Sequence, residues 1–398
     1  MNSKWLQVET LLFYFPGVKI VSTAGNTFDT VDEDGVRKMR YPKFLQAGDT
    51  IGFIAPSFGC VSEPYKSRFL MATDKFEKLG YRVEKGPNCY AADGIGKSST
   101  AEKCGAEINE FFCNRKCDII ISCGGGETMC EDLNYVDFEG IAAAEPKWYM
   151  GYSDNTNLTF ILPTMCDTAA VYGDNAPVFG MNEWHKSLTD TMELLKGKKP
   201  VMTNYDSWEA ESLITEETPF EAFNTVMPYE QKIYNANCKN QKKDDSALKN
   251  EENGADTEAY FEGRLLGGCL DCLINLCGTR FDHVKEFNER YKKDGVIWFL
   301  EACDLNPMGM RRALWQLKNA GWFDEAKGFL IGRSLHYSDD FGGYGCIDAV
   351  RDMLTDIGVP IVADIDIGHL PPRFPVISGA LGTVRASGNA LELEMKMT

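Results

Sequence analysis

The segment CDIIISCGGGETM, residues 117–129, sets the fold class of this chain. Its apolar run is typical of a strand buried on both faces, and three glycines follow at 124–126. Glycines in this position let backbone N–H groups approach a phosphate or a developing oxyanion. Phosphate is the weaker of the two ligands because the chain lacks a GxxxxGK[ST] motif. A tight turn with close helix packing explains the glycines equally well.

Short β-branched runs alternate with amphipathic stretches on both sides of this segment. TIGFIAP (50–56) predicts a first strand, residues 63–80 predict a helix that ends at Gly80, and WYMGYSDNT (148–156) predicts a strand entering a turn. Further strands are predicted at 295–302 and 328–333, with a helix at 308–321 between them. This alternation is typical of α/β folds, in which crossover helices connect parallel strands.

The length of 398 residues predicts two domains with separate cores. The polar, charged composition of residues 238–260 indicates a linker or insertion. We therefore divide the chain into an N-terminal extension 1–40, an N-terminal domain 41–205, a linker or insertion 206–260, and a C-terminal domain 261–398. Because ordered patterning begins near Met39, we hypothesise that this methionine is the true start and that residues 1–38 are appended or mobile.

Composition excludes several classes of function. The net charge of −18 would repel a phosphate backbone, so we expect no nucleic-acid partner. No apolar run is long enough to cross a bilayer, and the apolar stretch 11–21 is broken by Pro16 and lacks a basic leader. We expect a cytoplasmic protein without a membrane partner.

The 14 cysteines are scattered through apolar segments, which predicts reduced, mostly buried thiols. Cys269 and Cys272 form a CxxC, with Cys277 nearby, but no second ligand pair stands at zinc spacing. The spacing of these three residues instead predicts a buried apolar helix over 266–277. We expect no metal and no other cofactor.

GYSDNT (151–156) supplies the first catalytic candidate. A tight bend after the predicted strand would lift the hydroxyl of Ser153 clear of the sheet, as nucleophile elbows do. The GxSxG signature is not met, since Asn155 stands at the second glycine position. Taken alone, Ser153 and Asp154 are more often helix-capping residues.

VIWFLEACD (296–304) and DIGHLPPRFPVISGA (366–380) supply an acid and a base. Glu301 ends an apolar strand, where a buried carboxylate needs a partner, and Asp304 is the alternative acid. His369 lies between a glycine and a proline-stiffened loop, a rigid setting for an imidazole that transfers protons. The other three histidines lie in polar or helical contexts and are better explained as surface or structural residues.

The order and the residues of these motifs resemble those of the LD-carboxypeptidase family, which includes muramoyl-tetrapeptide carboxypeptidases and microcin C immunity peptidases. The resemblance covers roughly residues 41–382 and rests on GDTIGFIAPS (48–57), LNYVDF (133–138), GYSDNT (151–156), YGDNAPVFG (172–180), LLGGCLDCLINLCGT (265–279), FLEACD (299–304) and GHLPPRFPVISGA (368–380). It implies an N-terminal parallel sheet resembling the flavodoxin or class I amidotransferase arrangement and a C-terminal swivelling α/β domain. A homodimer is compatible with it.

Carried over by motif, the family's triad falls on Ser153, Glu301 and His369. Its oxyanion hole, formed by backbone N–H groups, falls on Gly125 or Gly126 and on Asp154.

The three glycines and Glu127 depart from the family's usual glycine pair, so the register of this turn stays open. Glu127 is accordingly a candidate substrate contact. A terminal carboxylate needs a cation, and Arg373, Arg311, Arg312 and Arg333 are equally placed candidates for it.

The resemblance implies a serine carboxypeptidase that cleaves an L,D amide bond before a C-terminal D-amino acid, as in a muropeptide tetrapeptide during murein recycling. The partner is then a small peptide. A first alternative is hydrolysis of aminoacyl nucleotide analogues, in which Trp208 or Trp184 would stack a base, although core or lid roles suit both tryptophans better. A second alternative, from another class, is a hinged two-domain binding protein without catalysis.

Overall fold

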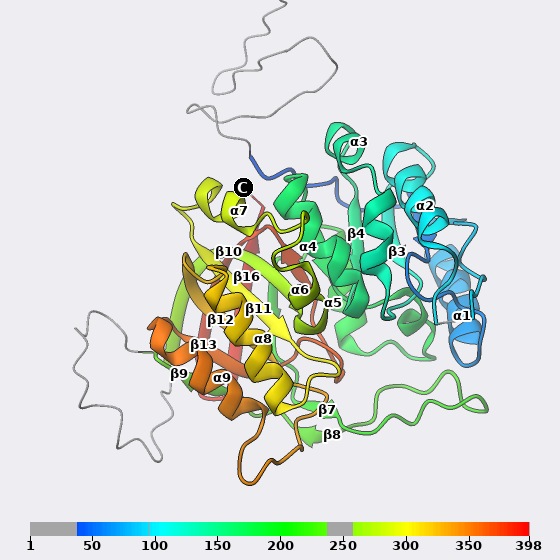
Figure 1. Ribbon diagram of the computed structural model, residues 1–398. Helices are drawn as coiled ribbons and strands as arrows, with labels where there is room; N and C mark the ends of the chain where they lie inside the picture. The colour runs from blue at the N-terminus through cyan, green and yellow to red at the C-terminus, as the bar shows by residue number, and fades with distance from the viewer. Residues whose placement is uncertain (1–37, 95, 237–257, 398) are drawn as a thin grey trace, which may run out of the picture.

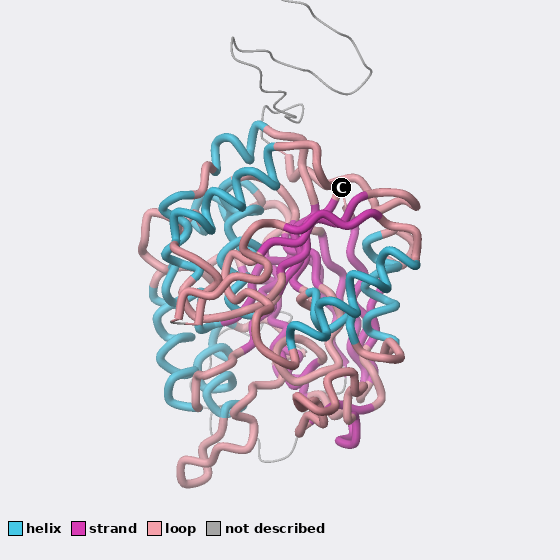
Figure 2. The backbone as a smooth tube through the Cα atoms, turned by 90° about the vertical axis from the view of Figure 1, so that its right-hand side faces the viewer, coloured by secondary structure: helices cyan, strands magenta, loops and turns pink. Residues whose placement is uncertain are grey.

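The computed structural model describes residues 38–94, 96–236 and 258–397, and contains two large β-sheets flanked by helices (Figure 1). Figure 2 shows the strands running through the middle of the molecule, with helices on both sides. This arrangement confirms the predicted α/β class with two domains. No helix within the described residues is both long and apolar enough to cross a membrane. Of the predicted extension 1–40, residues 1–37 lie outside the described residues.

The first sheet has six strands in the order β14-β5-β4-β3-β1-β2. The strands are β1 (Thr50–Ile54), β2 (Arg82–Lys85), β3 (Ile119–Ser122), β4 (Trp148–Gly151), β5 (Ala170–Tyr172) and β14 (Val376–Ser378). Strands β1 to β5 are parallel, and their order 2-1-3-4-5 is the flavodoxin-like one. β14 pairs antiparallel with β5, so the predicted C-terminal domain contributes a strand to the N-terminal sheet.

Helices flank the first sheet: α1 (Tyr65–Lys78), α2 (Ala101–Cys113), α3 (Phe138–Ala143), α4 (Thr156–Met165) and α5 (Lys186–Leu195). α2 illustrates how the sequence specifies them. Thr100 accepts a hydrogen bond from the backbone N–H of Lys103 and caps the helix. Cys104, Ile108 and Phe111 recur at helical spacing and are buried. Short 3-10 helices, η1 (Met129–Tyr135), η2 (Ser153–Asn155) and η3 (Ala176–Gly180), follow β3, β4 and β5.

The second sheet has eight strands in the order β6-β16-β15-β10-β11-β12-β13-β9. They are β6 (Val201–Thr203), β9 (Lys232–Tyr234), β10 (Glu258–Cys269), β11 (Val296–Glu301), β12 (Ala326–Gly332), β13 (Ile361–Ile365), β15 (Leu381–Ser387) and β16 (Ala390–Lys396). The central strands β10 to β13 are parallel and the outer strands antiparallel. α6 (Leu270–Leu276), α7 (Val284–Arg290), α8 (Pro307–Asn319) and α9 (Cys346–Leu354) are its helices. β15 and β16 pair with each other antiparallel and form a hairpin.

The helix predicted over 266–277 is wrong at its start, because β10 continues to Cys269 and α6 begins only at Leu270. β10 pairs with β11 as far as Cys269 opposite Glu301. A continuous apolar run does not distinguish a buried strand from a buried helix, and here pairing with β11 decides.

The predicted linker 206–260 contains strands as well. β7 (Ser207–Glu209) and β8 (Thr225–Pro228) pair with each other, and β9 joins the edge of the second sheet. The part of this segment over residues 237–257 lies outside the described residues. The predicted domain boundaries therefore stay predictions.

The two sheets share one large hydrophobic core, in contrast to the predicted separate cores. α4 is buried on every side, since its residues 156–164 are all buried. Phe160 of α4 stacks on Trp322 at 5.1 Å between ring centroids, which joins the N-terminal half to the second sheet. A second, smaller cluster that includes Ile120 and Tyr149 belongs to the first sheet. A helix that is buried on every side lies between two layers of the fold.

Candidate active site

Ser153 stands at the carboxyl end of β4, where the chain turns sharply into η2 and α4. Its φ of 65° lies in the left-handed region, an uncommon conformation for a residue with a side chain. Asn155 stabilises the turn, because its Nδ2 donates to the carbonyl oxygens of Gly124 at 2.8 Å and Tyr152 at 3.0 Å. Asn155 thus occupies the second glycine position of an elbow motif and ties the Ser153 turn to the glycine turn.

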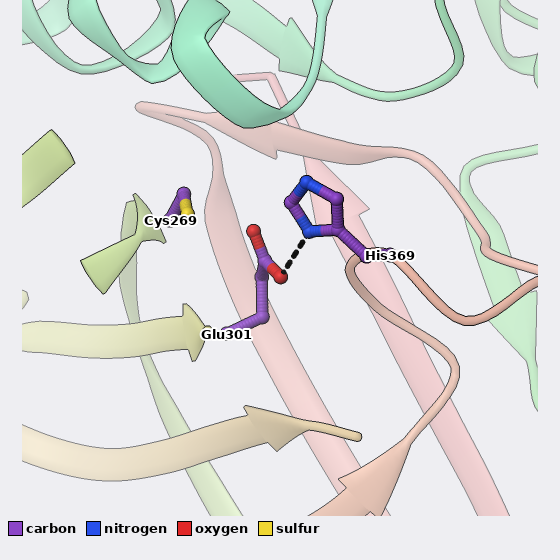
Figure 3. Close-up of side chains that lie close together, drawn as sticks. All are labelled: Cys269, Glu301 and His369. Carbon is purple, nitrogen blue, oxygen red and sulfur yellow. Dashed lines mark hydrogen bonds and ion pairs between the residues drawn. The ribbon is translucent and has the colours of Figure 1, made fainter. Parts of the chain in front are cut away.

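His369 connects Ser153 with Glu301. Its Nε2 lies 2.9 Å from Ser153 Oγ. Its Nδ1 lies 2.8 Å from Glu301 Oε2, as the dashed line in Figure 3 marks. Glu301 is the last residue of β11 and is completely buried, whereas Asp304 is exposed and does not contact His369. The structure therefore brings together the three residues predicted as a triad, and of the two candidate acids it is Glu301 that reaches the imidazole.

Tyr172 is a member of this network that sequence reasoning missed. Its hydroxyl donates to Glu301 Oε1 at 2.5 Å and accepts from the backbone N–H of Ser153 at 3.2 Å. Burial alone would raise the pKa of Glu301, but the neighbouring His369 and the hydrogen bonds from His369 and Tyr172 hold it below its ordinary value. Glu301 is thus an ionised acceptor. In the sequence, Tyr172 stood out only as part of the segment 172–180, which is one of the segments that carry the family resemblance.

Arg373 fixes the loop that carries His369. Its guanidinium forms a buried ion pair with Asp174 and donates to the backbone carbonyls of Gly368 and His369. It also lies 4.3 Å from the ring centroid of Tyr152. Arg373 is only 4% exposed, so the structure places it inside the protein and does not support the predicted contact with a substrate carboxylate.

Two of the other three candidate arginines form ion pairs as well. Arg311 forms an ion pair with Asp352, and Arg333 forms one with the buried Asp366, while Arg312 is exposed.

The glycine turn 124–126 packs directly against Ser153. A Cβ at Gly125 would lie 2.9 Å from Ser153 Cβ, and a Cβ at Gly126 would lie 2.2 Å from Ser57 Oγ, so no side chain fits at either position. Within the described residues the backbone N–H groups of Gly125 and Gly126 donate to no protein acceptor. This geometry is compatible with the predicted oxyanion hole.

Asp154 joins the Ser153 turn to the segments around the glycine turn. Its Oδ2 accepts from Ser57 Oγ at 2.5 Å and from the backbone N–H of Met129 at 3.0 Å, and its Oδ1 accepts from Asn157 Nδ2 at 3.0 Å. Burial raises the pKa of the Asp154 carboxyl, and these hydrogen bonds oppose the rise. The side chain of Asp154 therefore stabilises the local structure. This role is separate from the predicted role of its backbone N–H in the oxyanion hole.

The two remaining candidates lie in different places. Glu127 lines a small cavity that also contains Ser153. Trp208 is 7% exposed and lines another cavity, where Arg333 lies 5.1 Å from its ring and Tyr337 packs edge-on against it. The face of Trp208 is thus already covered by protein side chains, and the structure does not bring it together with the Ser153 cavity.

Cys269, Glu301 and His369 offer ligand atoms within 4.8 Å of one another, a group that could hold a metal ion (Figure 3). Both ring nitrogens of His369 already lie at hydrogen-bond distance from protein oxygens. The neighbouring Cys272 and burial raise the pKa of the Cys269 thiol well above its ordinary value, which disfavours the thiolate that a metal requires. Hydrogen bonding explains this group better than metal ligation.

The fold and the site together define a two-domain α/β protein in which a serine from one sheet meets a histidine and a glutamate from the other. The model of the LD-carboxypeptidase N-terminal domain matches residues 51–173, and that of the LD-carboxypeptidase C-terminal domain matches residues 262–384. The chain belongs to the LD-carboxypeptidase family, as its motifs predicted. This relation supports a carboxypeptidase-type hydrolase.

Named relatives include proteins of two activities. The chain is 24% identical to the microcin C7 self-immunity protein MccF of Escherichia coli, over 84% of this chain and 90% of the relative. It is also 24% identical to a probable murein peptide carboxypeptidase of Bacillus subtilis, over 90% and 96%. Among solved structures, MccF in its wild-type apo state has a TM-score of 0.71 and 20% identity, covering 89% of this chain and 98% of that one.

A MccF-like protein from Bacillus anthracis gives a TM-score of 0.67 at 21% identity, covering 90% of this chain and 100% of that one. At these identities the solved structures establish a shared fold.

Proposed function

We propose that the protein is a serine-type LD-carboxypeptidase that hydrolyses an L,D amide bond to a C-terminal D-amino acid. The observation that carries the proposal is the unbroken line of hydrogen bonds from Ser153 through His369 to Glu301, which joins the two sheets. A buried, ionised carboxylate behind an imidazole, with a serine hydroxyl in front of it, is the arrangement that activates a serine nucleophile.

In the proposed reaction, Ser153 attacks the amide carbonyl while His369 removes the hydroxyl proton. Glu301 fixes the imidazole tautomer and stabilises the imidazolium. The backbone N–H groups of Gly125 or Gly126 and of Asp154 would hold the tetrahedral oxyanion. His369 then protonates the departing amine. Water, activated by His369, hydrolyses the acyl-enzyme and restores Ser153.

A small peptide is the proposed substrate. Relatives of both named activities match the chain over most of its length, and one of them is a probable murein peptide carboxypeptidase. A muropeptide tetrapeptide that ends in D-alanine, shortened to the tripeptide as in murein recycling, is therefore the first substrate to test.

The test compares wild type with Ser153→Ala on a muropeptide tetrapeptide, with mass spectrometry of the products. We expect D-alanine and tripeptide from wild type only, and labelling of Ser153 by a fluorophosphonate probe. Full activity of Ser153→Ala would refute the triad assignment. Absence of both labelling and hydrolysis would favour the non-catalytic binding protein instead.

The same triad serves the alternative substrate, an aminoacyl nucleotide analogue. Solved MccF structures contain glutamyl sulfamoyl guanosine and aspartyl sulfamoyl adenosine, and their fold is that of this chain. An aminoacyl sulfamoyl adenosine should therefore be incubated in parallel. Hydrolysis of the nucleotide analogue without release of D-alanine from the tetrapeptide would replace the proposed substrate class and keep the catalytic residues.

A further inference from the structure

The CxxC formed by Cys269 and Cys272 stands where β10 passes into α6, close to the proposed triad. Cys269 is the last residue of β10 and the N-cap of α6, and Cys272 lies in the first turn of that helix. Cα atoms three residues apart in a helical turn are separated by roughly 5 Å, within the roughly 4.4–6.8 Å that a disulfide spans. Both residues are free thiols in the structure. The backbone therefore spaces these two cysteines as a disulfide requires.

The thiol of Cys269 lies beside Glu301. The two residues stand opposite each other in the pairing of β10 with β11, and the Cys269 sulfur lies within 4.8 Å of a Glu301 carboxylate oxygen (Figure 3). A hydrogen bond from this thiol contributes to the lowered pKa of Glu301. The sulfur also lies 3.3 Å from Asp271 Oδ2. Cys269 is thus a donor to the carboxylates next to it.

The thiol of Cys272 contacts the turn that carries the nucleophile. It donates to the backbone oxygen of Ser153 at 3.6 Å and lies 3.9 Å from Asp154 Oδ1. It also forms a hydrogen bond with the thiol of Cys269. The CxxC therefore connects the proposed acid on one side with the Ser153 turn on the other.

A small oxidant can reach Cys272 through the cavity beside Ser153. Both thiols line this cavity, which has a volume of about 40 Å³. One water molecule occupies roughly 30 Å³ in the liquid, so the cavity admits a molecule such as hydrogen peroxide and excludes a peptide disulfide. Cys272 is 9% exposed and Cys269 only 1%. Cys272 is thus the thiol that meets the oxidant.

Burial makes this thiol slow to react. The hydrogen bond with Cys269 lowers the pKa of Cys272, but burial and the nearby carboxylates outweigh it and leave the pKa raised. Because the thiolate is the form that attacks an oxidant, oxidation should require an excess of peroxide.

We propose that Cys269 and Cys272 form a reversible disulfide when hydrogen peroxide enters this cavity, and that the disulfide lowers the activity of Ser153. The effect on activity rests on the proposed function, whereas formation of the disulfide does not. Neither sulfur of a disulfide carries a hydrogen. Glu301 and the backbone oxygen of Ser153 would therefore each lose a donor, and the Ser153 turn would lose its hydrogen bond to α6.

Peroxide supplies the oxidising equivalents. The Cys272 thiol gives its proton to water, and its sulfur attacks one peroxide oxygen, which breaks the O–O bond and yields a sulfenic acid and hydroxide. The sulfur of Cys269 then attacks the sulfenic sulfur, and the S–O bond breaks. The departing oxygen takes the proton of Cys269 and leaves as water, while the hydroxide takes the proton released from Cys272. Two thiols and one peroxide thus give one disulfide and two waters, with two electrons transferred.

The experiment treats the full chain with excess hydrogen peroxide, then alkylates the remaining thiols and digests the protein. Mass spectrometry should find the peptide that contains Cys269 and Cys272 without alkylation and two hydrogens lighter. Activity on the muropeptide tetrapeptide should fall by about tenfold, because two hydrogen bonds next to the triad are lost. Dithiothreitol should restore both the alkylation and the activity.

Cys272→Ser keeps a hydrogen-bond donor at this position but cannot form the disulfide. Peroxide should therefore leave this variant with the activity it had before treatment. Cys130→Ser/Cys303→Ser is the matched control, because it removes two other thiols that line the same cavity. This control should form the disulfide and lose activity as wild type does.

Alkylation of both cysteines after peroxide treatment of wild type would overturn the inference, and so would a disulfide from Cys272 to Cys130 or Cys303. A Cys269–Cys272 disulfide that leaves activity unchanged would overturn its regulatory effect. If the untreated protein cleaves neither the tetrapeptide nor the nucleotide analogue, the proposed function fails, and mass spectrometry still decides whether the disulfide forms.

Discussion

The hydroxyl of Tyr172 touches two groups of the proposed reaction, the carboxylate of Glu301 and the backbone N–H of Ser153. Tyr172→Phe leaves Glu301 with an unsatisfied buried oxygen, so we expect kcat/KM to fall by roughly tenfold with little change in KM. In wild type the hydrogen bond from Tyr172 lowers the pKa of Glu301, so its loss in the variant raises that pKa. The acid limb of the kcat/KM profile should therefore move to higher pH in the variant.

Tyr205→Phe is the control, because it removes a buried hydroxyl that bonds Asp190, outside the proposed triad. It should keep the wild-type pH profile. A Tyr172→Phe enzyme with unchanged kcat/KM and an unchanged acid limb would contradict a positioning role for this hydroxyl.

Asp132 is a second residue whose titration should have a measurable effect, here on the stability of the fold. It is 2% exposed, its Oδ2 accepts no hydrogen bond from the described residues, and burial together with Asp154 raises its pKa to about 8. Between about pH 4 and 8 the folded chain keeps a proton that the unfolded chain has lost. Stability therefore falls as pH rises through this window.

Asp132→Asn removes this penalty. We expect the free energy of unfolding in urea to rise by roughly 1–3 kcal/mol at pH 8 and to be unchanged at pH 4. Asp93→Asn, at an exposed position, should change stability at neither pH. A gain at pH 4 equal to that at pH 8 would show that titration of Asp132 is not the cause.

At this scale the sequence predicted residues within specific motifs and missed those defined by tertiary contact. Ser153 and His369 stand in distinctive local patterns. Tyr172 reaches Glu301 only because β5 brings it there. The sequence does not reveal that Arg373 is buried, because its partner Asp174 lies far away in sequence.

Among the elements, β10 contains a glycine at which no side chain fits. Gly267 has φ +156°, and a Cβ there would lie 1.8 Å from the carbonyl oxygen of Phe299 in β11. Gly267→Ala should therefore cost about 3 kcal/mol or more in the free energy of unfolding, because backbone must move. Gly263→Ala, in the same strand, should cost less, since its nearest atom is Ile297 Cγ1 at 3.1 Å. Urea unfolding measures both, and equal costs would refute the steric argument.

The sequence specified most elements but not the end of β10. Helical spacing and Gly80 predicted α1, and the β-branched run predicted β3. Pairing partners distinguish strand from helix in an apolar run, and those partners are distant in sequence.

At the scale of the whole molecule, the Asp174–Arg373 ion pair connects the loop after β5 with the loop that carries His369. Asp174→Asn leaves a buried guanidinium without its partner, which should cost about 3–5 kcal/mol in stability. Asp174→Asn/Arg373→Met should be less destabilised than the single variant, because no lone charge remains. Thermal unfolding of the single and double variants tests this, and additive losses would contradict it.

The alternation of strands and helices predicted the α/β class and two sheets, but not how the sheets share strands. β14 and β6 are each only three residues long, and each joins the sheet built mainly by the other half. Such short segments carry no periodicity that could assign them.

The antiparallel pairing of β14 with β5 also sets an order for biosynthesis. The N-terminal half leaves the ribosome first, but its sheet keeps the open edge of β5 until residues 376–378 have been made. A chain truncated before residue 376 should therefore associate with itself in size-exclusion chromatography, whereas a monomeric, folded truncation product would contradict this. The half that carries Ser153 is thus expected to be completed only after residues 376–378 have been made, by which point His369 has been made as well.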